Sequence, residues 1–237
     1  MNKVYCTILS IACFWIYSAG LRAQDKTVML QFKHRVGNAP LQLFEETYTN
    51  AFGEPFVVSK FKYYISHIVV TDINSRETVL ANSYYLVNEE DSLSKIIRLA
   101  VAGPLKLISF TVGVDSARNV SGVQSGSLDP VNAMFWTWNS GYVFAKLEGQ
   151  SDASTAPAHS FSWHAGGFRQ KENALRKIVL PVNNTGTSSV VVINVNVLKW
   201  FDAVHPLKIA ASPVCHQPGA LAMLLADNYS KMFSVSP

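Results

Sequence analysis

A strict alternation of apolar and polar residues is the feature of this sequence that most restricts its fold. In "VMLQFKHRV" (residues 28–36), one face holds apolar residues and His34, and the other face holds polar residues. The segment "KFKYYISHIVV" (residues 60–70) repeats this pattern, with the alternating set Phe61, Tyr63, Ile65, His67 and Val69. A period of two is typical of a strand with one buried face. Both segments are therefore predicted to be half-buried antiparallel strands.

Six further runs have the same character and are rich in β-branched and aromatic residues. They are "TVLANSYYLV", "LKLISFTVGV", "GYVFAKLEG", "HSFSWH", "LRKIVLPV" and "SSVVVINVNVLKWF". Helical patterns occur only in residues 40–50 and 219–233, the second of which follows Pro218. These patterns predict an all-β fold, an antiparallel β-sandwich with long loops and a short C-terminal helix.

The N-terminus has the layout of a secretory signal peptide. Lys3 precedes an apolar run from residue 4 to residue 17, and small residues lead to Ala23. The run has too few residues for a membrane span, which needs about 20, and it continues past Cys13, which makes a poor lipid-attachment site. We expect residues 1–23 to be removed, and residues 24–237 to form a single exported domain without a membrane span.

The charge and the cysteine count exclude several classes of protein. The formal charge is +4 for the whole sequence, and it falls to +2 when Lys3 and Arg22 are removed with the signal peptide. No basic block is present, which argues against binding to nucleic acid or to an anionic membrane surface. Cys215 alone remains of the three cysteines, so no internal disulfide is expected.

No familiar catalytic motif is present, but two tryptophans stand out. The sequence lacks GxSxG, HExxH, CxxC and a phosphate-binding glycine-rich loop. Residues 114–134 form a Gly/Ser-rich stretch that is too long for a simple turn and leads directly to Trp136 and Trp138. Plain core or loop packing explains a pair of indoles well. In an extended segment, however, both would lie on one face beside polar neighbours.

The six histidines are scattered, so any metal site must be assembled by the fold. His34 and His67 lie on the apolar faces of their predicted strands, where a hydrogen-bonded core histidine is the simpler interpretation. His164 ends its strand before Gly166 and is better placed to reach a ligand. The pair Cys215 and His216 could bind a soft metal. A small buried residue next to a surface histidine explains that pair equally well.

Several segments together resemble one known family. "FKHRVGNAPLQLFEETYTNAFGEPFVVSKFKYYISHI", "FWTWNSGYVFAKLEG", "FSWHAGGF", "NVNVLKWF" and "ADNYSKMF" are similar, in this order, to the MbnP-like copper-binding proteins, named for the methanobactin-operon periplasmic protein. The similarity covers residues 27–233. It implies an exported β-sandwich that binds copper. It also implies a di-haem partner of the cytochrome c peroxidase type, which in some members oxidises a tryptophan to kynurenine.

The resemblance also implies particular site residues. His34 of "KHRVG" and His164 of "WHAGG" match the family's histidine positions, and His67 stands where the family more often has asparagine. Trp136 or Trp138 would be the modified tryptophan. Copper is chemically reasonable for such a set, because imidazole suits copper and Cu(II) outcompetes other divalent ions at a nitrogen site.

These observations favour an exported, periplasmic copper-binding protein that acts in copper acquisition, storage or handling and is not itself an enzyme. The alternative is a β-sandwich binding module without a metal, whose loops at residues 121–139 and 151–159 hold a glycan or a protein. An independent oxidoreductase is disfavoured because the sequence carries no cofactor fingerprint.

Overall fold

A computed structural model describes residues 26–80, 83–101, 103–137, 139–182 and 189–236. The signal-peptide prediction and Trp138 lie outside these residues. The smaller of the two main sheets has five strands, in which β17 (Phe233–Val235), β15 (Val190–Asn196), β1 (Lys26–Val36) and β2 (Ala39–Pro40) follow one another and β7 (Ile96–Val101) also pairs with β1.

The larger sheet has ten strands and supplies most of the molecule's frame. Its main path is β14 (Arg176–Pro181), β8 (Leu105–Val112), β4 (Pro55–Asp72), β10 (Gly141–Gln150), β11 (Ser160–Gly166) and β16 (Val214–Cys215). The short strands β3 (Tyr48–Thr49), β5 (Glu77–Val79) and β6 (Tyr84–Asn88) pair with β4, and β9 (Phe135–Thr137) pairs with β10. A separate two-stranded ribbon joins β12 (Phe168–Arg169) to β13 (Glu172–Asn173).

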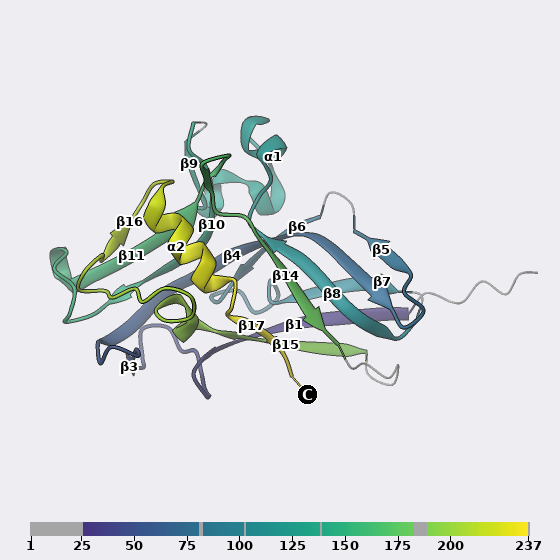
Figure 1. The fold of residues 1–237 in the computed structure, drawn as a ribbon, viewed down its shortest axis with the longest axis horizontal. Coiled ribbons are helices and arrows are strands. Elements are labelled where there is room, and N and C mark those ends of the chain that lie inside the picture. Colours follow the sequence, from purple (N-terminus) through teal and green to yellow (C-terminus); the bar gives the residue numbers. More distant parts are fainter. Residues whose placement is uncertain (1–25, 81–82, 102, 138, 183–188, 237) are drawn as a thin grey trace, which may run out of the picture.

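Helices are few and short. The α-helices are α1 (Ser116–Val120) and α2 (Ala220–Tyr229), and single turns of 3₁₀ helix occur at Gly126–Leu128, Pro130–Asn132, Pro157–His159 and Val197–Trp200. Helix α2 packs next to β11 (Figure 1). Among the described residues, no helix has the length and apolar character needed to cross a bilayer.

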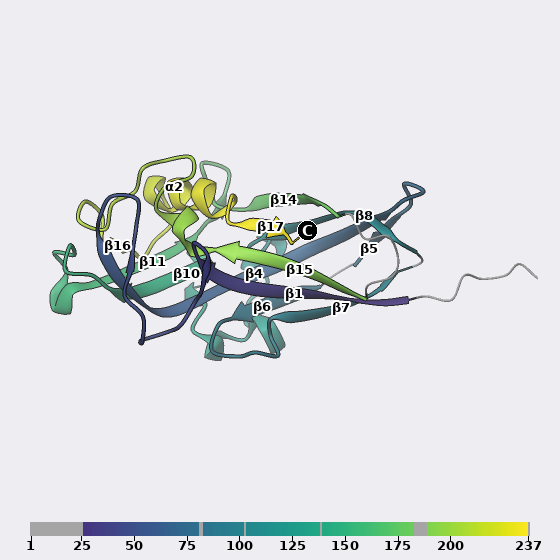
Figure 2. The same ribbon diagram turned by 90° about the horizontal axis from the view of Figure 1, so that it is seen from below.

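The two sheets pack face to face around one continuous apolar core (Figure 2). Phe32 of β1 and Tyr63 of β4 meet in this core, with ring centroids 6.2 Å apart. In β1 the predicted alternation is observed, because Val28, Leu30 and Phe32 are almost fully buried. The structure confirms the all-β sandwich. Most pairings are antiparallel, but β1 pairs with β15 and β11 pairs with β16 in parallel.

The alternation predicted for β4 holds only for its first half. Phe61, Tyr63 and Ile65 are fully buried, but the pairing of β4 with β8 shifts between Ser66 and Val69. His67 lies in this irregularity with a φ of 49° and a mostly exposed side chain. The prediction that His67 shares the face of Phe61 is therefore wrong, because an extra residue in a strand reverses the faces that follow it.

Two predictions for helices had different outcomes. The C-terminal helix forms as α2, but it ends at Tyr229, and the chain then continues into strand β17. The helix predicted for residues 40–50 is wrong, since this segment contains turns and the short strand β3. The Tyr48 hydroxyl closes the segment into a loop by donating to the Pro40 carbonyl and accepting from the Gln42 amide.

The long connection between β8 and β9 covers the outer face of the larger sheet, on the side opposite to β1 and β15 (Figure 1). Three side chains of the sheet fasten this connection. The Tyr64 hydroxyl donates to the Ser127 carbonyl, the Tyr142 hydroxyl donates to the Leu128 carbonyl, and Lys146 Nζ donates to the Ala133 carbonyl. The predicted long loop is therefore an anchored cover that positions β9 and its tryptophan.

Candidate metal centre

The outer face of the larger sheet carries His164. On β11, Trp163 is fully buried against the core, so its neighbours Ser162 and His164 point to the opposite face. His164 pairs with Lys146 of β10, and Lys146 pairs with Lys62 of β4. His164 therefore belongs to a polar row that crosses the sheet.

His216 lies beside His164 on this face. Strand β16 places Cys215 opposite Trp163, so Cys215 is buried and the next residue, His216, reaches the outer face. The two imidazole rings are stacked, with centroids 4.4 Å apart and an angle of 29° between their planes. Nε2 of His164 and Nε2 of His216 lie 3.0 Å and 2.7 Å from the same Ser162 Oγ. Two imidazole nitrogens therefore converge on one point.

A carboxylate and a lysine complete the surroundings of His164. Glu148 Oε1 lies 2.7 Å from His164 Nε2 and 3.5 Å from Lys146 Nζ. The hydrogen bond from His164 is the main reason that the pKa of Glu148 falls to about 2, and the charge of Lys146 adds to it. Burial lowers the pKa of His164 in spite of this hydrogen bond, and burial also lowers the pKa of Lys146. At neutral pH a neutral imidazole thus faces an ionised carboxylate.

Trp136 of β9 packs against strand β11 at Gly166, two residues after His164. A Cβ atom on Gly166 would lie 2.9 Å from Cζ3 of Trp136. Residues 164 and 166 share a face of β11, so the indole covers the outer face next to the histidine pair. Trp136 Nε1 is buried and has no hydrogen-bond partner in the described part of the chain. Trp136 therefore lies at this centre, and Trp138 lies outside the described residues.

His34 is held on the other side of the larger sheet, inside the sandwich. Its Nδ1 lies 2.5 Å from Glu89 Oε2, and its Nε2 lies 2.9 Å from the Tyr63 hydroxyl. Its ring also packs against Phe61, whose side chain is fully buried between the sheets. The structure does not bring His34 and His164 together, because the sheet separates them and both ring nitrogens of His34 already have partners.

His67 lies apart from both of these histidines. It follows Lys62 by five residues along β4, which corresponds to about 16 Å of extended chain, and Lys62 marks the level of His164. Its Nδ1 lies 3.1 Å from Ser66 Oγ, and its Nε2 lies 3.7 Å from Asp115 Oδ2. The three histidines named by the resemblance thus occupy three separate environments.

His216 is the site residue that sequence reasoning undervalued. The signal was the pair Cys215 and His216, whose interpretation depended on which strand this segment joins. Only the parallel pairing of β16 with β11, more than 45 residues earlier in the chain, shows that Cys215 turns inward and His216 outward. Burial raises the pKa of the Cys215 thiol to about 11. The buried thiol is therefore protonated, and His216 is the better ligand.

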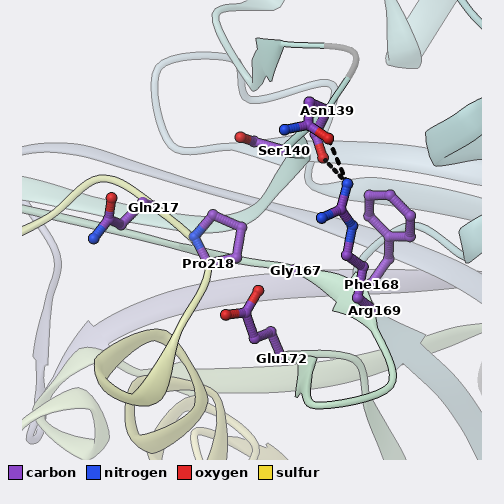
Figure 3. Close-up of a pocket in the computed structure, with 8 residues that line it drawn as sticks. All are labelled: Asn139, Ser140, Gly167, Phe168, Arg169, Glu172, Gln217 and Pro218. Carbon is purple, nitrogen blue, oxygen red and sulfur yellow. Dashed lines mark hydrogen bonds between the residues drawn. The ribbon is translucent and has the colours of Figure 1, made fainter.

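A hollow is lined by residues that follow the two histidines in the sequence, but neither histidine lines it (Figure 3). It has a volume of about 210 Å³ and lies between the turn at Asn139 and Ser140 and the segment Gln217–Pro218, which directly follows His216. Arg169 crosses toward Asn139 and donates to its side-chain and backbone oxygens (Figure 3). A second hollow, of about 310 Å³, is lined by His216 together with Gln217 and Pro218, so the centre has a flank that a small ligand could reach.

The residues at this centre could offer two imidazole nitrogens to a metal ion. Within the described ranges, no three His, Cys, Asp or Glu side chains are grouped closely enough to hold a metal. His164 and His216 nevertheless offer two converging imidazoles, which suit copper, with Glu148 as a neighbouring oxygen donor. Nε2 of His164 would have to release its proton to bind a metal, and imidazole can carry that proton on Nδ1 instead.

Comparisons with known proteins identify the family. The family model for MbnP matches residues 25–217. Among solved structures, MbnP from Methylosinus trichosporium is similar with a TM-score of 0.60 and 13% sequence identity, over 84% of this chain and 82% of that one. At this identity the structural likeness concerns the fold alone. No curated protein matches significantly. The family-model match confirms the resemblance seen in the sequence, and the chain belongs to the MbnP family.

Proposed function

We propose that this chain is an exported, non-catalytic copper-binding protein that acts in periplasmic copper handling, and that His164 and His216 hold the ion. Membership of the MbnP family supports copper as the metal. The observation that carries the site is the convergence of both Nε2 atoms on Ser162 Oγ, at 3.0 Å and 2.7 Å. Imidazole is a preferred ligand of copper.

The neighbours of the pair favour reversible binding. Bound copper would be a cation with open coordination positions, because two imidazoles and one weaker donor do not close a site. Glu148 supplies the negative charge that such an ion needs, and its ion pair with Lys146 holds the carboxylate in place. The hollow lined by His216 and Gln217 gives a route by which a second carrier could approach. This arrangement suits storage or transfer.

We assign to Trp136 the oxidation of tryptophan to kynurenine that the family resemblance implies. Its indole covers the face that bears His164, so opening of its pyrrole ring would put an aromatic amine and a ketone next to the copper ligands. The oxidant would be a di-haem partner of the cytochrome c peroxidase type, as the resemblance implies.

Copper stoichiometry tests the ligand assignment. The purified protein should retain copper after desalting, and His164→Ala with His216→Ala should abolish this binding, because no imidazole remains at the site. His159→Ala is the matched control, since that histidine is exposed on a different loop. Elemental analysis and competition with a chromophoric copper chelator measure the result.

A further variant separates this site from the ligand set implied by the resemblance. His34→Gln should keep full copper stoichiometry, because His34 lies inside the sandwich. Unchanged binding in the double variant at residues 164 and 216, or loss of binding in His34→Gln with a normal unfolding curve, would contradict the assignment.

Intact-mass analysis tests the modification. Protein produced together with its di-haem partner should show a mass change that peptide mapping localises to Trp136, and Trp136→Phe should show none. Trp200→Phe is a control within the same chain, because Trp200 is buried in the core. A mass change that persists in Trp136→Phe would reassign the modified residue, and identical masses with and without the partner would remove this part of the proposal.

A further inference from the structure

Among four almost fully buried tyrosines, one has a hydrogen-bond partner of a different kind from the others. Tyr63, Tyr64, Tyr142 and Tyr229 are all almost fully buried. The hydroxyls of Tyr64, Tyr142 and Tyr229 donate to the backbone carbonyls of Ser127, Leu128 and Ala174. Tyr63 instead faces the imidazole of His34 at 2.9 Å. A backbone carbonyl does not become protonated at neutral pH, whereas a neutral imidazole can take up a proton.

Glu89 fixes the tautomer of His34 so that the imidazole accepts from Tyr63. Burial would raise the pKa of Glu89, but its hydrogen bonds to His34 and Lys95 bring this pKa below its usual value. The ionised carboxylate lies 2.5 Å from Nδ1 of His34, so Nδ1 carries the hydrogen. Nε2 is then the lone-pair nitrogen, and the Tyr63 hydroxyl donates to it. Burial lowers the pKa of His34, so the ring is neutral and ready to accept a proton.

The row from Tyr63 through His34 to Glu89 leads from the core to the surface. The side chain of Tyr63 is fully buried, that of His34 is enclosed, and that of Glu89 is 14% exposed and 2.9 Å from Lys95 Nζ. β1 pairs with β7 as far as Gln31 and with β2 from Arg35, which leaves a window between them. A hollow of about 540 Å³ lies at this window and is lined by His34, Glu89 and Lys95. A positive charge on His34 would thus be stabilised by a carboxylate in contact with solvent.

We propose that Tyr63 is a redox-active tyrosine whose phenolic proton passes to His34 when the ring is oxidised by one electron. A metal-centred one-electron oxidant from outside the chain takes the electron and is reduced by one unit. The O–H bond of Tyr63 breaks, and an N–H bond forms at Nε2 of His34. The products are a neutral phenoxyl radical and an imidazolium ion that donates from Nδ1 to Glu89. Re-reduction of the radical returns the proton to Tyr63.

The surroundings of Tyr63 favour coupled transfer of the proton and the electron. Burial, helped by the charge of Glu89, raises the pKa of Tyr63 well above its usual value, so the phenol does not ionise before it is oxidised. Aromatic rings surround it, with the centroids of Phe61 and Phe233 at 5.4 Å and 5.6 Å. These rings exclude water and would protect the radical. Tyr63 also pairs with Ala145 and Ala145 with Ala165, which puts it about 10 Å across the sheet from the strand of His164.

Photochemical oxidation tests the proposal without copper or a protein partner. Flash-quench oxidation of the purified protein by a ruthenium(III) tris-bipyridine complex, followed by freezing and electron paramagnetic resonance, should give a neutral tyrosyl radical. Tyr63→Phe should lose the long-lived signal. Tyr229→Phe should retain it, because the Tyr229 hydroxyl donates only to a carbonyl. An identical signal in Tyr63→Phe and in the unmodified protein would overturn the proposal.

The role of His34 as proton acceptor has a separate readout. His34→Gln should lower the radical yield and remove its solvent deuterium isotope effect, because the amide cannot keep the proton. The yield in the unmodified protein should fall at acidic pH, where His34 becomes protonated and can no longer accept, and this acid limb should be absent in His34→Gln. A yield and an isotope effect that both survive in a folded His34→Gln variant would refute the relay. This outcome would leave the copper assignment untouched, because His164 and His216 take no part in it.

Discussion

At the scale of single residues, the side of a strand on which a histidine stands determines its chemistry in this protein. His34 and His164 each follow the alternation of their own strands. Alternation turns His34 into the sandwich, where Glu89 and Tyr63 engage both of its nitrogens. It turns His164 to the outer face, where an ion could reach it. The faces were predictable from the sequence, but the pairing of strands that surrounds each ring was not.

Gly166 gives a residue-scale prediction for the placement of Trp136. A Cβ atom at this position would lie 2.4 Å from the Tyr142 carbonyl oxygen and 2.9 Å from the Trp136 ring. We expect Gly166→Ala to displace the indole and to lower the free energy of unfolding by about 1–3 kcal/mol, as overpacking does. Urea denaturation and the tryptophan emission spectrum measure the two effects.

Gly103→Ala is the matched control for this change, because nothing lies within 4 Å of a Cβ atom there. Its free energy of unfolding should change by less than about 0.5 kcal/mol. Equal effects of the two substitutions would show that Trp136 does not pack on Gly166.

At the scale of elements, Lys146 ties the long outer connection to the larger sheet. Its buried ammonium group donates to the Ala133 carbonyl at 2.7 Å and lies 3.5 Å from Glu148. Lys146→Met should loosen the connection, because the Ala133 carbonyl loses its donor and Glu148 loses a cation. Trypsin should then cut at Arg118 of α1 faster than in the unmodified protein, at a rate followed by mass spectrometry.

Lys177→Met serves as the control, since Lys177 is an exposed residue on β14. It should leave the cleavage rate at Arg118 unchanged. Cleavage that is equally slow in Lys146→Met would mean that the tyrosine contacts to Ser127 and Leu128 are sufficient to hold the connection.

The elements also show where sequence reasoning reaches its limit. The alternation of apolar and polar residues predicted the long strands, because a strand with one buried face has apolar side chains at every second position. It did not give the irregularity at His67, because an inserted residue is decided by the partner strand β8. The helix expected for residues 40–50 failed for a related reason, since the Tyr48 hydroxyl provides a tertiary contact to Pro40 that local pattern does not contain. The site was the least predictable part, because His164 and His216 come together only through the pairing of β11 with β16.

At the scale of the whole molecule, the described fold is held by packing and hydrogen bonds, and its cysteine is a free thiol. Cys215 is buried, and burial raises its pKa to about 11. Its thiol should therefore react with Ellman's reagent only after unfolding, and the midpoint of thermal unfolding should be the same with and without a reductant. Absorbance of the released chromophore and circular dichroism measure the two results.

A variant with an accessible thiol makes this prediction specific. Val214 is 45% exposed and precedes Cys215, so Val214→Cys should add one thiol that reacts in the folded state. Rapid labelling of the unmodified protein would contradict the buried position of Cys215.

The parallel pairing of β1 with β15 has a consequence for how this chain reaches its native state. Met29 pairs with Val190, and β15 in turn pairs with the C-terminal strand β17. The first strand can pair with β2 and β7 early, but one of its two edges finds its partner β15 only after most of the polypeptide has been synthesised. Chains dominated by such distant contacts acquire structure slowly, so the nascent protein should stay loosely organised until synthesis is almost complete. A chain that stays unfolded until late in its synthesis would suit the proposed export, because a secretion channel passes extended polypeptides.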